Sequence, residues 1–106
     1  MIDQITPAEF VERRAAGEDF LLLDVREPRE LAVASVDGAL HIPMAQVPAR
    51  LAELDRERHI VVMCHSGGRS QAVAGFLRQQ GYTQVSNLLG GISRWSREVD
   101  PSVPLY

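Results

Sequence analysis

Two short segments of almost unbroken apolar residues constrain the fold of this chain more than any other feature. Residues 20–25 are Phe-Leu-Leu-Leu-Asp-Val, and residues 59–64 are His-Ile-Val-Val-Met-Cys. A strand with one face in water alternates apolar and polar residues, whereas a strand of a parallel sheet is covered on both faces. Segments with helical character lie between these runs. We therefore predict an α/β fold with a mainly parallel central β-sheet flanked by helices on both faces.

Punctuating residues place the other elements. Thr6 is expected to cap a helix that begins at Pro7, and Glu9 completes a capping box. Further helices are expected over 28–33, 48–54, 70–80 and 91–97, and short strands over 39–43 and 84–88. No linker or repeat divides the 106 residues. That length is typical of one domain, so a single domain over residues 1–106 is predicted.

Composition excludes several classes of protein. The formal net charge of -3 argues against nucleic-acid binding, which usually needs a basic surface. No apolar run approaches the roughly 18 residues of a membrane span. The first four residues, Met-Ile-Asp-Gln, lack the features of a secretion signal, so we expect no membrane association and a cytoplasmic location.

Metal and disulfide sites are also not expected. Cys64 is the single cysteine, which rules out an internal disulfide and a multi-cysteine zinc site. The three histidines, His41, His59 and His65, are too far apart in sequence to form a local metal-binding motif. The remaining candidate for chemistry is the lone thiol.

Residues 64–70, Cys-His-Ser-Gly-Gly-Arg-Ser, join the most β-prone strand to the longest predicted helix. Gly67 and Gly68 permit positive φ, so the backbone can curl with its N–H groups inward and bind an anion. The N-terminus of the following helix directs its own N–H groups to the same point. The pKa of a thiol held there should be lowered. A buried, inert cysteine is the competing interpretation, and the glycines and Arg69 favour the reactive one.

Three stretches of the sequence resemble the signatures of the rhodanese family of sulfurtransferases. They are residues 23–30 with Gly38-Ala39 and Ile42-Pro43, residues 64–70, and residues 89–92 with Trp95. Their order and spacing match the family over nearly the whole chain. The resemblance implies a single rhodanese-like domain.

The resemblance also implies a chemistry. Cys64 would take the outer sulfur of a small anionic donor such as thiosulfate, become a persulfide, and pass the sulfur to cyanide or a thiol, including a protein thiol. The backbone N–H groups of His65, Ser66, Gly67, Gly68 and Arg69 would hold the negative charge. No metal or organic cofactor is implied. The loop has four residues between Cys64 and Arg69, which resembles the sulfur-transferring members of the family. The related phosphatases and arsenate reductases have five. The shorter loop forms a tighter ring that suits a sulfur atom, whereas a phosphate needs a wider one.

Side chains around the cysteine have two interpretations each. Arg69 could bind an anionic donor or pair with a carboxylate. The hydroxyls of Ser66 and Ser70 could donate to the sulfur, although Ser70 could equally cap its helix. His65 would add positive charge when protonated. Relatives often have Arg or Lys there, so weaker use of doubly charged thiosulfate is expected.

Residues 24–30 are expected to support the site from a neighbouring strand end. Asp24 could fix the geometry of the cysteine loop or make a simple strand-end hydrogen bond. Arg26 and Glu30 are four residues apart across a short helix and are expected to form an ion pair.

Three other functions stay open: a persulfide-relay or binding module for a protein partner, a small phosphatase or arsenate reductase, and a non-catalytic scaffold. The intact Cys64 argues against the last of these.

Overall fold

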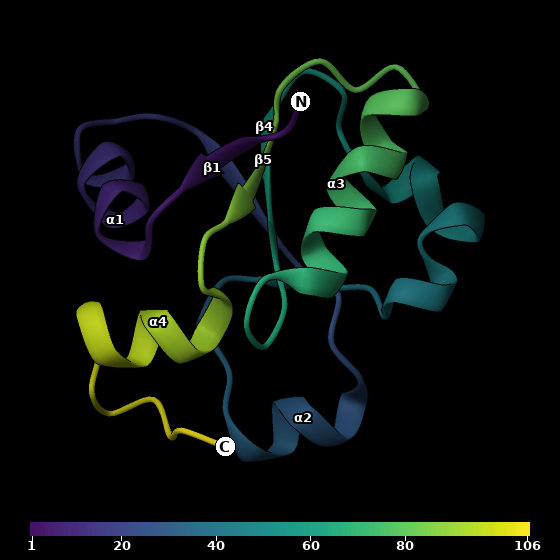
Figure 1. Cartoon of the computed structure of the whole chain (residues 1–106). Coiled ribbons are helices and arrows are strands. Elements are labelled where there is room, and N and C mark those ends of the chain that lie inside the picture. Colours follow the sequence, from purple (N-terminus) through teal and green to yellow (C-terminus); the bar gives the residue numbers. More distant parts are fainter.

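The computed structural model describes residues 1–106, which form five strands, four α-helices and two 3-10 segments (Figure 1). The strands are β1 (Asp3–Ile5), β2 (Phe20–Asp24), β3 (Leu40–His41), β4 (His59–Met63) and β5 (Val85–Leu88). The helices are α1 (Pro7–Ala15), α2 (Pro28–Val33), α3 (Gly68–Gln79) and α4 (Gly91–Glu98), and the 3-10 segments are η1 (Met44–Gln46) and η2 (Pro48–Glu53). None of the helices combines the length and the apolar content needed to cross a membrane.

All five strands pair in parallel, in the order β1-β5-β4-β2-β3. Helix α3 covers one face of this sheet, and α1 and α4 cover the other (Figure 1). The predicted α/β class and the helices on both faces are confirmed. Because parallel strands end at the same edge, the turns that follow β2, β4 and β5 meet there.

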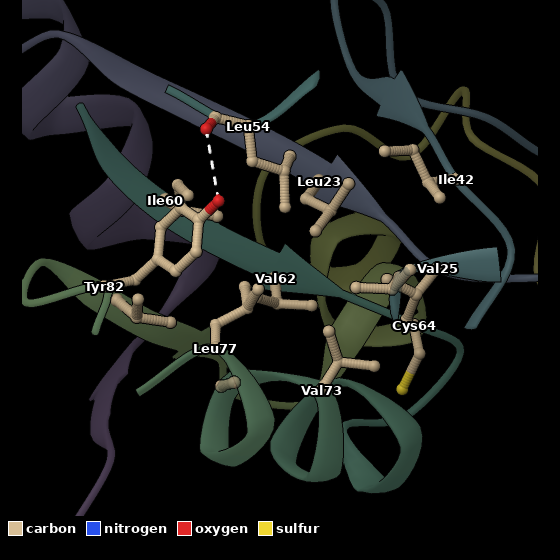
Figure 2. Packing of buried hydrophobic residues seen from close by; sticks show 13 residues of the cluster. Leu23, Val25, Ile42, Leu54, Ile60, Val62, Cys64, Val73, Leu77 and Tyr82 are labelled. Carbon is tan, nitrogen blue, oxygen red and sulfur yellow. Dashed lines mark hydrogen bonds between the residues drawn. The ribbon is translucent and has the colours of Figure 1, made fainter. Parts of the chain in front are cut away.

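The core has two layers, and β4 contributes to both. Ile60 and Val62 pack with the residues of α3, as Figure 2 shows. Val61 and Met63 pack on the opposite face, in the cluster that holds Phe10 and Trp95. Alternate side chains of a strand point to opposite faces, so a strand buried on both sides has no polar alternation.

Local signals in the sequence set most element boundaries. The capping box of α1 forms as predicted: the Thr6 hydroxyl accepts from the Glu9 N–H at 3.1 Å, and the Glu9 carboxylate accepts from the Thr6 N–H at 2.9 Å. Strand β1 was not predicted, because only one of its three residues is buried and no period can show. The helix expected over 48–54 is present as a 3-10 segment over Pro48–Glu53, with a kink at Arg50. Helix α3 begins two residues earlier than predicted.

Helix α4 holds the turn after β4 by its backbone. The Ile92 N–H donates to the Cys64 carbonyl at 2.9 Å, and the Ser93 N–H donates to the His65 carbonyl at 3.1 Å. Gly91 has φ +60°, and a Cβ there would lie 2.5 Å from both carbonyl oxygens. A glycine is therefore required where α4 meets the turn.

Arg26 forms a buried ion pair with Asp24. Its Nη2 lies 2.7 Å from Asp24 Oδ2, and the two side chains are 0% and 1% exposed. Arg26 also donates to the Ala34 carbonyl at 2.9 Å. The expected ion pair between Arg26 and Glu30 is wrong: a buried guanidinium needs a carboxylate at the same depth, which Asp24 supplies.

We predict that Arg26→Met lowers the free energy of unfolding by about 3–5 kcal/mol, because Asp24 is left buried without its partner. Arg50→Met is the matched control, since Arg50 pairs with Glu53 at the surface. Its expected loss is below about 1 kcal/mol. Urea unfolding at neutral pH measures both. Equal losses for the two variants would contradict this account of the buried pair.

Gly91→Ala is expected to destabilise the protein by more than about 2 kcal/mol, because of its left-handed backbone and the contact with two carbonyl oxygens. Gly75→Ala is the control, since a Cβ at this α3 position meets nothing within 4 Å. That change should stabilise by about 0.5–1 kcal/mol. Thermal or urea unfolding of the two variants checks the opposite signs.

Candidate active site

Cys64 follows the last residue of β4 and lies at the end of the core. It is 1% exposed and packs in the same cluster as Val25 and Val73 (Figure 2). Its sulfur nevertheless has polar neighbours. The Gly67 N–H donates to Sγ at 3.1 Å, and the Ser70 hydroxyl oxygen lies 3.3 Å from it. The thiol thus stands at the boundary between the apolar core and a polar turn.

The turn 64–69 directs N–H groups at the sulfur. In a trans peptide the carbonyl and the next N–H point in opposite directions. Because α4 binds the Cys64 and His65 carbonyls, the N–H groups of His65 and Ser66 face the other side of the turn. Gly67 takes φ +115° and precedes α3 as its N-cap. The prediction for Gly68 is corrected, because this residue has ordinary helical backbone with room for a side chain.

The pKa of Cys64 reflects two opposed effects. Burial raises it, whereas hydrogen bonds from the Ser70 hydroxyl and from the N–H groups of Ser70, Gly67 and Ser66 lower it. The hydrogen bonds outweigh the burial, so the pKa of the thiol lies below its ordinary value. The N–H groups of His65, Gly68 and Arg69 donate no hydrogen bond to Sγ.

Ser70 is part of the sulfur site and does not cap the helix. It lies in the first turn of α3, where its hydroxyl also contacts the Asn87 side-chain oxygen. The Asn87 amide group donates to the Gly67 carbonyl at 3.3 Å and to Gln4 at 2.9 Å. Sequence reasoning missed Asn87. The available signal was an asparagine within the short strand predicted over 84–88, of which Val85–Leu88 are all buried.

Arg69 pairs with a carboxylate, as one of its two interpretations expected. Its Nη1 and Nη2 lie 2.6 and 2.9 Å from the two oxygens of Glu30. The hydrogen bonds from Arg69 hold the pKa of Glu30 far below its ordinary range. Glu30 was expected to pair with Arg26, and its actual partner comes from 39 residues further along the chain.

Tyr106 covers the outer side of the turn. Its ring stacks on His65 with the ring centroids 4.0 Å apart. Its hydroxyl donates to Glu30 at 2.8 Å and accepts from Arg26 Nη1 at 2.9 Å. Figure 1 shows this end of the chain beside α2. His65 therefore faces an aromatic ring, and its buried Nε2 has no hydrogen-bond partner.

Asp24 and Arg26 lie behind the site and do not touch the sulfur. Asp24 binds the side chain of Arg26 and accepts from its N–H at 3.0 Å, and it makes no hydrogen bond to the turn 64–69. The strand-end interpretation of Asp24 is the one that the structure supports. Arg26 connects this pair through Tyr106 to Glu30.

An open groove of about 440 Å³ lies beside the turn. It is lined by Val25, Glu27, Met44, Ala45, Pro48 and Arg69. A second hollow of about 470 Å³ lies between α2, α4 and the C-terminal segment, and none of the residues 64–70 lines it. The groove at Arg69 is thus the one of these two that borders the cysteine turn, and Arg69 is the residue of the turn that lines it.

Known proteins resemble this chain over its sequence and its fold. Residues 6–98 match the family model of the rhodanese-like domain. A sulfurtransferase of Allochromatium vinosum is 41% identical over 103 residues, which are 97% of this chain and 96% of that protein. The rhodanese-like/PpiC domain-containing protein 12 of Arabidopsis thaliana is 43% identical over 89 residues, which are 80% of this chain but only 30% of that protein.

A solved structure agrees with these matches. The rhodanese-related protein of Thermoplasma volcanium superposes with a TM-score of 0.84 at 34% identity, covering 98% of this chain and 99% of that one. The resemblance found in the three sequence stretches is thereby confirmed, and sulfur transfer is the chemistry that the name of the Allochromatium relative supports. The chain belongs to the rhodanese-like domain family.

Proposed function

We propose that this protein transfers sulfane sulfur through a persulfide on Cys64. The observation that carries the proposal is the environment of the sulfur. The only thiol of the chain lies in a turn where N–H groups and the Ser70 hydroxyl lower its pKa. A thiolate is the nucleophilic form of cysteine, and this environment favours it.

In the first half-reaction the Cys64 thiolate attacks the outer sulfur of the donor. With thiosulfate, a bond forms between Sγ and that sulfur while the sulfur–sulfur bond of the donor breaks and sulfite leaves with its electron pair. Total charge is conserved, since a persulfide anion and sulfite replace a thiolate and thiosulfate. Gly68 and Arg69 lie in the first turn of α3, where N–H groups have no partner within the helix, and these are the donors we assign to the new outer sulfur.

In the second half-reaction a thiophilic acceptor removes the outer sulfur. Cyanide would leave as thiocyanate, and a thiolate would leave as a persulfide, with Cys64 restored as a thiolate in both cases. A protein thiol is one such acceptor. The groove beside Arg69, which is open and partly apolar, supports the approach of either kind.

Intact mass spectrometry after incubation with thiosulfate tests the first half-reaction. The wild-type chain should gain one sulfur atom, which cyanide or dithiothreitol then removes, because the persulfide is the transferable form. Cys64→Ser should gain none. A wild-type mass that stays constant with thiosulfate and with organic persulfides as donors would refute sulfur transfer.

The rate of alkylation of Cys64 by iodoacetamide as a function of pH tests the environment of the thiol. The midpoint should lie below that of a cysteine in an unstructured peptide measured in the same buffers, because the lowered pKa extends the thiolate form to lower pH. Ser70→Ala should move the midpoint upward, since a hydrogen bond to the thiolate is lost. Ser86→Ala is the matched control, as this buried serine contacts His59 and not the sulfur. A midpoint that does not change in Ser70→Ala would contradict the role given to its hydroxyl.

A further inference from the structure

The groove beside the cysteine turn, together with the ion-pair partner of its arginine, holds one cation and two carboxylates. Arg69 and Glu27 line the groove, and Glu30 binds Arg69 from the side. One guanidinium and two carboxylates sum to a formal charge of -1. Long-range attraction of a doubly charged anion needs an excess of formal positive charge, and this groove lacks that excess.

Glu30 is fixed in its position against Arg69. One carboxylate oxygen accepts from Arg69 Nη1 and from the Glu27 N–H, and the other accepts from Arg69 Nη2 and from the Tyr106 hydroxyl. These four hydrogen bonds use all the acceptor positions of a carboxylate. The side chain is 13% exposed, so water competes little for it. The charge of Arg69 is therefore compensated by a carboxylate that is held in place by four hydrogen bonds.

Arg69 is adjacent to the sulfur site, because it directly precedes Ser70 in α3 and the Ser70 hydroxyl oxygen lies 3.3 Å from Sγ. In agreement with this, the pKa of Arg69 is raised chiefly by Glu30 and further by the negative charge of Cys64. An anionic donor that approaches Sγ would meet the same guanidinium, with its field already reduced by Glu30.

We propose that Glu30 is the specificity-determining residue for the charge of the sulfur donor. By compensating Arg69, it disfavours the dianion thiosulfate and favours sulfane-sulfur donors that carry one charge or none, of which organic persulfides are the simplest class. This inference rests on the proposed function, because it assumes that Cys64 accepts sulfur from a donor, and it adds which class of donor suits the site.

The half-reaction with an organic persulfide needs no reactant other than the donor and the Cys64 thiolate. The Cys64 thiolate attacks the outer sulfur of R–S–SH, a bond forms between Sγ and that sulfur, and the bond between the two donor sulfurs breaks. The R–S group leaves with the electron pair as a thiolate, and the proton stays with the new persulfide or passes to the leaving thiolate.

Glu30→Gln tests the proposal, because it removes the charge but keeps an oxygen that can accept from the Glu27 N–H in the helix cap. Cys64 is alkylated with iodoacetate, an anion, and with iodoacetamide, which is neutral. The ratio of the two rates should rise about threefold in Glu30→Gln, since one uncompensated cation then faces the anionic reagent. A variant that merely loosened the turn would change both rates and leave the ratio constant.

The same comparison with sulfur donors tests the specificity itself. Persulfide formation from thiosulfate, relative to that from hydroxyethyl persulfide, should rise about tenfold in Glu30→Gln, because the dianion gains more from the uncovered charge. In the double variant Glu30→Gln/Arg69→Gln both ratios should return toward the wild-type values. Both increases should shrink in high salt.

Glu18→Gln is the matched control. Glu18 also forms a two-point pair with an arginine, Arg13, but it precedes β2 and thus lies at the opposite edge of the sheet from Cys64. Constant ratios in Glu30→Gln, or an equal rise in Glu18→Gln, would overturn the proposal. So would a wild-type thiosulfate reaction that slows steeply with salt, which needs no variant. If neither donor forms a persulfide, the proposed function fails while the alkylation ratio still decides the role of Glu30.

Discussion

The site depends on two hydrogen bonds that α4 makes to the backbone of the turn after β4. The N–H groups of Ile92 and Ser93 bind the carbonyls of Cys64 and His65, and peptide planarity turns the following N–H groups to the opposite side. Gly91 permits this contact, because any side chain there would displace the two carbonyls. The orientation of the first two amides of the turn, those of His65 and Ser66, is thus set from outside the turn by α4.

Behind the turn, charged groups are arranged in an alternating chain. Asp24 binds Arg26, whose guanidinium donates to the Tyr106 hydroxyl, which donates to Glu30, which binds Arg69. The first pair is fully buried and the last reaches the groove. A buried charge needs a partner, and this arrangement supplies one at each step. Its result at the surface is a guanidinium that is fixed in place and largely neutralised.

The fold could be predicted from the sequence because its signals are local. Apolar strands without alternation indicated a parallel sheet, and Thr6 with Glu9 marked the start of α1. Cys64 and Ser70 were found because glycine and the strand-to-helix change mark the turn. The partner of Arg69 could not be predicted, because helical spacing placed Glu30 opposite Arg26. The sequence does not show that the Arg26 side chain is fully buried and therefore pairs with Asp24 instead. Tyr106 carried no signal, because its contacts join residues that are far apart in the chain.

The parallel order of the sheet has a kinetic consequence. The turn and the residues that support it come from 24–30, 64–70, 87–93 and 106. Two of the four strand pairings, β1 with β5 and β2 with β4, join strands that do not follow each other in sequence. Contacts of such high sequence separation form late, since long loops must close before they are made. A partly folded chain would therefore expose an ordinary, unactivated thiol, and the reactivity of Cys64 would appear only with the last contacts of the native state.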